Sequence, residues 1–476
     1  MAFARRCGAQ PNERLNINLM AEHIEDDGAS RELWLPRKDH LVDPSDIRLT
    51  TVTLDDPFLL TRDDVISVDL TYDFDRATLR SISAYAQNDT RSQDDCAGLP
   101  QLRGCVRGVR PATYEQWSQE IHLGSPVSAS WDWLIGLFFL DAQASTNFHF
   151  SAPLLAPGPI NDYSATSKER AYAGFGQASR SLNQRWSITG GLRLSHEAHR
   201  VSELGTGIAD QRVPTAAGGS WDSASWRIGM QYAPADDVLV YASVATGFKS
   251  GGVTTELLPT GEFDSFDPED LTAYEAGINL RLPNRRWWLL ASAFFYDFRD
   301  LQIRTTAVLA NRVVSVVDNA AAARIRGIDL SATMDVSDRL ALSGALVWMP
   351  KREFVEFTNV ATGDTLSGNT LSRAPERTAS VSLSYLLPLR RIGDLSARVD
   401  YNYRSEFFFT HDNDPATAQD GFGLLNLFLR LVSPDESWYL FASARNLLDT
   451  DYFNQVFIQS SPGYPENYEI GFGLRF

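Results

Sequence analysis

The sequence predicts an all-β fold, an antiparallel transmembrane β-barrel of about eighteen strands in one domain that spans residues 1–476. Three observations predict it. Apolar residues alternate with polar or small residues along the whole chain, tight turns alternate with long polar segments, and aromatic residues make up 11% of the sequence, with 11 tryptophans. This combination is typical of strands that cross a membrane with one face toward lipid.

The strand pattern is clearest at the C-terminus. Five apolar residues alternate there with glutamate, glycine and arginine, and the chain ends on an aromatic residue. In a strand, every second side chain lies on the same face, so this segment presents one apolar face. The five residues are Tyr468, Ile470, Phe472, Leu474 and Phe476.

The connections between the expected strands are short at one end and long at the other. This asymmetry distinguishes the short periplasmic turns of outer-membrane barrels from their long extracellular loops. We expect strands of roughly 10 to 14 residues, an even number of them, and both termini on the short-turn side. The short turns are expected at 73–76, 182–184, 234–237, 283–285, 336–338 and 434–436, and the long segments at 25–62, 88–112, 144–167, 200–220, 250–268, 351–372 and 407–419.

Composition excludes two other classes of protein. Mean hydropathy is -0.22, and no run of about eighteen uncharged apolar residues is present, so the sequence does not predict membrane-spanning helices. The net charge of -17 argues against a nucleic-acid partner, because binding phosphate requires clustered lysine and arginine.

Six tryptophans follow closely after expected short turns. Rings at the start of a strand are typical of an aromatic girdle at a membrane interface, and the alternative is ordinary packing of tryptophan in a β core. The six are Trp131, Trp133, Trp186, Trp287, Trp288 and Trp438.

The chain has three cysteines, two of which lie close together in one polar segment. Cys96 and Cys105 are expected to form a disulfide within an extracellular loop, with two free thiols as the alternative. Cys7 is then left unpaired.

The sequence contains no convincing catalytic, metal or cofactor motif. The segment 247–252 lacks the spacing of a phosphate-binding loop and is expected to end a strand and open a loop. His196 and His199 are three residues apart, whereas two ligands on one face of a strand need an even spacing, so no metal site is expected between them. No nucleophile elbow or zinc-protease motif is present, and we do not expect an enzyme.

Several segments resemble the barrel domain of TonB-dependent receptors, the outer-membrane active transporters for ferric siderophores and similar nutrient complexes. The resemblance covers almost the whole chain, in the family's order and spacing. It includes a strand-to-loop segment, the strand that follows it, a penultimate-strand signature and the terminal aromatic residue that the barrel-assembly machinery reads. These segments are 241–252, 274–277, 446–452 and Phe476, with weaker matches at 114–121 and 374–376.

The sequence also departs from the family pattern. Family barrels have about 22 strands around a plug domain, with an energy-coupling box and a signal peptide before it. None of these three N-terminal parts is recognised here, and residues 5–14 look like the end of a strand and its turn. We therefore expect a C-terminal fragment whose plug and first strands are absent.

The resemblance implies a function for the full-length protein. It implies a monomeric receptor in the outer membrane of a Gram-negative bacterium that imports a ferric siderophore or similar nutrient complex. The expected partners are outer-membrane lipid, the barrel-assembly machinery, and the TonB complex, which would act only through the plug. Two alternatives remain: a passive porin-like channel, and an outer-membrane enzyme or adhesin that uses its long loops.

Overall fold

The protein forms one large antiparallel sheet of nineteen strands in a computed structural model. The structure describes residues 2–29, 35–36, 58–95, 106–126, 131–151, 159–206, 212–257, 263–282, 286–309, 312–359, 363–456 and 459–475. The sheet contains β1 (Ala2–Asn12), β2 (Leu15–Ala29), β4 (Phe58–Asp73), β5 (Thr78–Asp95), β6 (Val106–Gly124), β7 (Trp131–Ser151), β8 (Pro159–Ser181), β9 (Trp186–Thr206), β10 (Arg212–Ala235), β11 (Val238–Lys249), β14 (Glu269–Leu282), β15 (Trp287–Leu309), β16 (Arg312–Ser337), β17 (Leu340–Phe357), β18 (Arg377–Leu389), β19 (Gly393–Arg404), β22 (Phe422–Val432), β23 (Trp438–Arg445) and β26 (Asn467–Leu474).

Several short elements lie in the connections at the long-loop end of this sheet. They are β3 (Leu35–Pro36), β12 (Gly252–Leu257), β13 (Phe263–Phe266), β20 (Phe407–Phe408), the 3-10 helix η5 (Pro415–Thr417), β21 (Ala418–Gln419), β24 (Phe453–Val456) and β25 (Gln459–Pro462). Among the described residues, no helix is long and apolar enough to cross a membrane.

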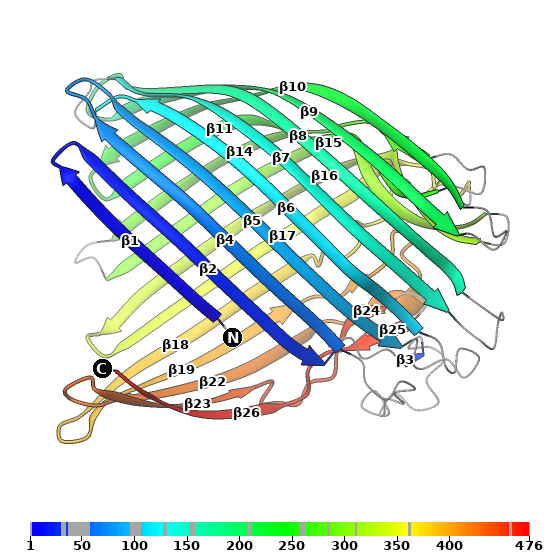
Figure 1. The fold of residues 1–476 in the computed structure, drawn as a ribbon. Helices are drawn as coiled ribbons and strands as arrows, with labels where there is room; N and C mark the ends of the chain where they lie inside the picture. Colours follow the sequence, from blue (N-terminus) through cyan, green and yellow to red (C-terminus); the bar gives the residue numbers. More distant parts are fainter. Residues whose placement is uncertain are drawn as a thin grey trace.

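Each strand of the large sheet pairs with the next such strand along the chain, so the topology is a simple meander. Figure 1 shows the sheet curled into a barrel-shaped wall, with β1 and β26 as its two edge strands. No pairing joins these two end strands within the described ranges. The predicted fold class, an antiparallel barrel-type sheet with short turns and long loops, is confirmed.

The strand count corrects one expectation. The described residues form nineteen strands, an odd number, so β26 ends on the short-turn side whereas β1 begins away from it. Residues 5–14, expected as the end of a strand, form most of β1 and the tight turn into β2. That turn lies at the short-turn end, and the chain therefore enters β1 from the long-loop end, as Figure 1 shows.

The strands are also longer than expected. β8 and β10 contain 23 and 24 residues, and they continue well into segments that looked like polar loops. Antiparallel pairing uses main-chain groups, so a ladder can continue beyond the apolar band wherever two chains run side by side. Side-chain polarity therefore marked the edge of the apolar band rather than the end of the strand.

The alternation of faces is confirmed, and so is the placement of the tryptophans. Four of the six begin strands on the short-turn side: Trp131 in β7, Trp186 in β9, Trp287 in β15 and Trp438 in β23. In β26 the side chains of Tyr468, Ile470, Phe472 and Leu474 are all more than half exposed. Phe476 lies outside the described residues.

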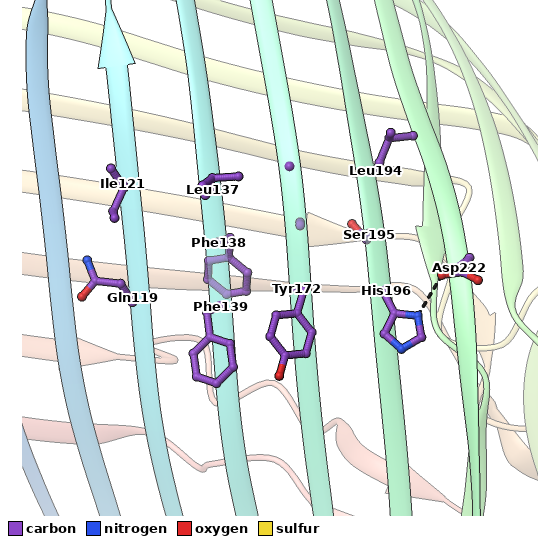
Figure 2. A pocket seen from close by; sticks show the side chains of 12 residues that line it. Gln119, Ile121, Leu137, Phe138, Phe139, Tyr172, Leu194, Ser195, His196 and Asp222 are labelled. Carbon is purple, nitrogen blue, oxygen red and sulfur yellow. Dashed lines mark hydrogen bonds and ion pairs between the residues drawn. The ribbon is translucent and has the colours of Figure 1, made fainter.

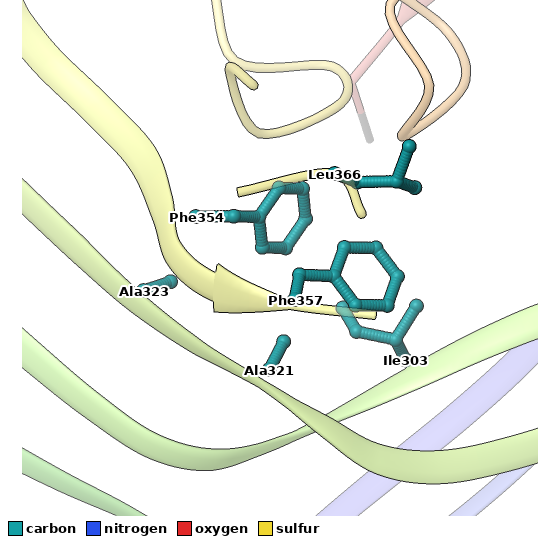
Figure 3. Packing of buried hydrophobic residues seen from close by; sticks show 6 residues of the cluster. All are labelled: Ile303, Ala321, Ala323, Phe354, Phe357 and Leu366. Atoms are coloured by element: carbon teal, nitrogen blue, oxygen red, sulfur yellow. The ribbon is translucent and has the colours of Figure 1, made fainter. Parts of the chain in front are cut away.

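The compact apolar packing of this chain lies at the long-loop end rather than along the wall. Figure 3 shows Phe354 and Phe357, at the end of β17, packed with Leu366 of the following loop. The alanines of β16 and Ile303 of β15 complete this cluster. A second cluster joins Phe407 and Phe409 to Val456. These clusters fix the loops to the rim of the wall.

One turn on the opposite side depends on glycine. Gly393 begins β19 with φ of 129°, and a Cβ atom there would lie 1.8 Å from the carbonyl oxygen of Val432. We predict that Gly393→Ala lowers the free energy of unfolding by at least about 1–3 kcal/mol, because it adds a clash and backbone strain. Urea unfolding in detergent micelles, followed by tryptophan fluorescence, measures the change.

Gly190→Ala is the matched control for this turn. Gly190 lies in β9, and a Cβ there would have no atom within 4 Å. The control is expected to unfold like the parent protein. Equal unfolding midpoints for the two variants would contradict the special role of Gly393.

Candidate functional site

The outer face of the wall carries an apolar groove across β6 to β10. Figure 2 shows Phe139, Tyr172 and His196 in front of their strands, with the far wall of the barrel visible behind them. Leu137 and Leu194, which also line the groove, are more than half exposed. We call this side of the sheet the outer face, and the side toward the barrel interior the inner face.

The two histidines of β9 lie on opposite faces. His196 is on the outer face, where its Nδ1 lies 2.8 Å from Oδ1 of Asp222. β9 pairs with β8 and β10 without any shift in register, so side chains alternate strictly along it. His199, three residues further on, is therefore on the inner face. The two histidines therefore lie on opposite faces of the sheet, in keeping with their odd spacing.

His199 instead belongs to a cluster that the sequence analysis missed. Glu197 is two residues before it on the same face, and Glu169 of β8 is directly opposite it in the ladder. One ligand atom from each of the three side chains lies within 4.8 Å of the other two. Nε2 of His199 is 3.7 Å from Oε1 of Glu169, beyond hydrogen-bond distance. Among the described residues this buried nitrogen has no hydrogen-bond partner.

A tryptophan and the start of a folded hairpin pack beside this cluster. The ring of Trp221 in β10 contacts the imidazole of His199 edge to face, with 5.6 Å between centroids. Gly251 packs on the same indole, because a Cβ there would lie 2.5 Å from two of its ring atoms. From Gly252 the chain continues into the β12–β13 hairpin, which contacts β9, β10 and β16. The hairpin therefore connects β9 and β10 with the distant strand β16 on the inner face of the sheet.

The cluster differs from the other histidine–carboxylate pairs of the wall. His23 pairs with Asp64, His122 with Glu120 and His196 with Asp222, each with a single carboxylate. In the part of the chain that the structure describes, only the group on β8 and β9 brings three metal-ligating side chains together. The signal in the sequence was Glu197-Ala-His199, an even spacing within a strand.

Two further expectations can be located. The segment 247–252 ends β11 at Lys249 and leads into β12, as expected for a strand that opens into a loop. Cys96 and Cys105 both lie outside the described residues, so their disulfide stays a prediction. Cys7, in β1, is an exposed free thiol.

At the long-loop end, His411 holds two loops together. Its ring contacts Phe354 and Phe357 edge to face, and Nδ1 lies 3.1 Å from Oγ of Ser372. The side-chain amide of Asn369 donates to its carbonyl oxygen. Burial disfavours the charged imidazolium and lowers the pKa of His411 below its ordinary value, and nearby Asp412 opposes this shift.

Comparison with known proteins shows to which family the chain belongs. Residues 15–447 match the family described as TonB dependent receptor-like, beta-barrel. The chain belongs to this family. The expected resemblance is thereby confirmed, and the family consists of receptors and transporters rather than enzymes.

Solved TonB-dependent receptors share the fold. The ferric yersiniabactin uptake receptor FyuA of Yersinia pestis aligns over 98% of this chain and 68% of its own, with a TM-score of 0.79 and 19% identity. The ferric-catecholate import receptor Fiu of E. coli K12 aligns over 100% of this chain and 74% of its own, with a TM-score of 0.74 and 13% identity. At such identities the likeness concerns the fold alone.

Curated relatives are also receptors. The metal-pseudopaline receptor CntO of Pseudomonas aeruginosa strain UCBPP-PA14 is 24% identical over 298 residues, which cover 62% of this chain and 39% of the relative. CntO from strain PAO1 is 25% identical over 256 residues, 34% of its length. The chain thus spans less than half the length of the curated relatives it matches.

The loop contact at His411 predicts a pH dependence. The depressed pKa means that the stabilisation is complete above the ordinary imidazole value of 6.5 and is lost as pH falls through the lower folded value. We expect faster amide exchange in residues 366–372 and 409–417 at pH 5.5 than at pH 7.5, after correction for intrinsic rates. Hydrogen exchange with mass spectrometry measures it.

The controls separate His411 from other titrating groups. His411→Phe should remove most of the pH dependence, because no imidazole is then left to charge at this position. His196→Gln changes an exposed histidine on the outer face and should leave the dependence intact. Equal protection of both segments at the two pH values in the parent protein would show that His411 does not hold them together.

Proposed function

We propose that this chain forms the wall of an outer-membrane receptor whose full-length form imports a ferric siderophore or a similar metal complex by TonB-coupled transport. The observation that carries the proposal is the family match over residues 15–447. The names of its relatives support the substrate class, since they include receptors for ferric yersiniabactin, ferric catecholate and metal-pseudopaline.

The outer face supports a location in a lipid bilayer. Large apolar side chains are exposed at every second position of several strands, for example Ile188, Leu192 and Leu194 in β9, and Ile228 and Met230 in β10. Soluble monomers rarely expose contiguous apolar surface of this extent. In a barrel of the Gram-negative outer membrane this surface contacts lipid, and the tryptophans after the short turns form an interfacial girdle.

Energy coupling is the finer part of the proposal. In the family, the TonB complex acts on a plug domain inside the wall, and the extracellular loops hold the ligand against that plug. We infer the same arrangement for the full-length protein, as a monomer. The disulfide between Cys96 and Cys105, in the connection between β5 and β6, would stiffen one of these loops.

Uptake measurements test the proposal. The complete gene is expressed in a Gram-negative strain that lacks its own ferric-siderophore receptors, and accumulation of radiolabelled ferric siderophores and other metal chelates is measured. We expect uptake that requires both the protein and an intact TonB complex. Uptake that persists without TonB would support the alternative of a passive porin-like channel, and no uptake or binding of any metal chelate would refute the substrate class.

The C-terminal strand makes a separate prediction about assembly. Deleting Phe476 or replacing it with aspartate should reduce insertion of the full-length protein into the outer membrane several-fold, because the terminal aromatic residue resembles the signal for the barrel-assembly machinery. Heat-modifiable mobility of the protein in outer-membrane fractions measures the inserted amount. Arg475→Lys is the neighbouring control, and normal insertion without Phe476 would mean that the terminal residue is not the signal.

A further inference from the structure

We propose that Glu169, Glu197 and His199 form a binding site for one divalent transition-metal ion on the inner face of the wall. The inference stands on the local geometry of β8 and β9 and does not depend on TonB-coupled transport. It assigns to the barrel wall a metal-binding role of its own.

The distances fit a shared ion. In tetrahedral zinc sites, ligand atoms about 2.0–2.2 Å from the metal are separated by about 3.4 Å from one another. Nε2 of His199 and Oε1 of Glu169 are 3.7 Å apart, and all three ligand atoms lie within 4.8 Å. Small side-chain rotations bring such atoms onto one ion without movement of the backbone.

The imidazole nitrogen gives an independent reason for a ligand. Nε2 of His199 is almost completely shielded from solvent and has no hydrogen-bond partner among the described residues. Buried polar atoms are nearly always satisfied, so an exception calls for an explanation, of which a bound ion is one. A metal ion bound at Nε2 would satisfy this atom and neutralise the two neighbouring carboxylates.

The strands hold the three side chains in place. Glu197 and His199 are alternate residues of one strand, and Glu169 faces His199 across an unbroken ladder. The edge-to-face contact with Trp221 restricts the imidazole, and Gly251 packs against the same indole. The ligands are therefore fixed by two rigid strands rather than by a loop, which favours tight binding.

The donor set selects the class of metal. One imidazole nitrogen and two carboxylate oxygens suit borderline ions such as Zn²⁺, Co²⁺ and Ni²⁺. Calcium takes six to eight oxygen ligands, and magnesium prefers a near-ideal octahedron of oxygens, so both fit poorly. Three protein ligands leave a fourth tetrahedral position for water or for a donor atom of a second molecule inside the barrel.

Cobalt titration tests the site directly. The chain, purified without a histidine tag and folded in detergent micelles, is titrated with Co²⁺ while the visible absorption of the ion is recorded, and Zn²⁺ is then added as a competitor. We expect one Co²⁺ per chain, absorption bands of a low-coordinate site, and displacement by Zn²⁺ but not by the same concentration of Ca²⁺. No binding, or equal displacement by Ca²⁺, would overturn the assignment.

Variants locate the bound ion. Glu197→Gln keeps the shape of the side chain and His199→Gln keeps much of its volume, and each should weaken Co²⁺ binding at least about tenfold. His196→Gln is the matched control, since it changes a histidine of the same strand on the outer face (Figure 2) and should leave binding unchanged. Unchanged affinity in Glu197→Gln, in protein whose heat-modifiable mobility shows a folded barrel, would refute the site, and so would loss of binding in His196→Gln.

Discussion

The antiparallel ladder is the constraint on which the rest of this structure depends. Each strand between β1 and β26 pairs its main-chain groups with two neighbouring strands, and inside a bilayer nothing else can satisfy these groups. Because side chains along a paired strand alternate in direction, the register decides which residues face outward. A single shift in β9 would exchange His196 and His199 between the two faces, moving one away from Asp222 and the other away from Glu169.

The same constraint applies to the two ends of the sheet. β1 and β26 each have one strand neighbour among the described residues, so one side of each ladder is free there. Unpaired main-chain groups cost several kcal/mol each in hydrocarbon. The apolar outward side chains of β26, with Ile470 84% exposed, fit lipid contact only where that free edge is also paired. The outward side chains of β26 can therefore contact lipid only if the free main-chain edge of that strand is paired as well.

The sequence predicted the strands because their alternation is local, and it predicted the short turns because proline, asparagine and aspartate gather there. It misjudged the ends of the strands, since β8 and β10 continue through polar segments that carry no local mark of pairing. The inner cluster was out of reach for a related reason. Glu197 and His199 show an even spacing, but Glu169 joins them only through the β8–β9 register, which the turn at 182–185 sets.

The same few strands thus present apolar side chains on the outer face of the wall and metal-ligating side chains on its inner face. On the outer face of β8 and β9, Tyr172 and Leu194 line a mostly apolar groove. On the inner face, the ring of Trp221 contacts His199, whose Nε2 is shielded from solvent, and the β12–β13 hairpin contacts the neighbouring strands β9 and β10. Electrostatic attraction between a cation and carboxylates is stronger where water is excluded. The packing of Gly251 on Trp221 therefore links the start of the hairpin to the ligand cluster that the β8–β9 ladder positions.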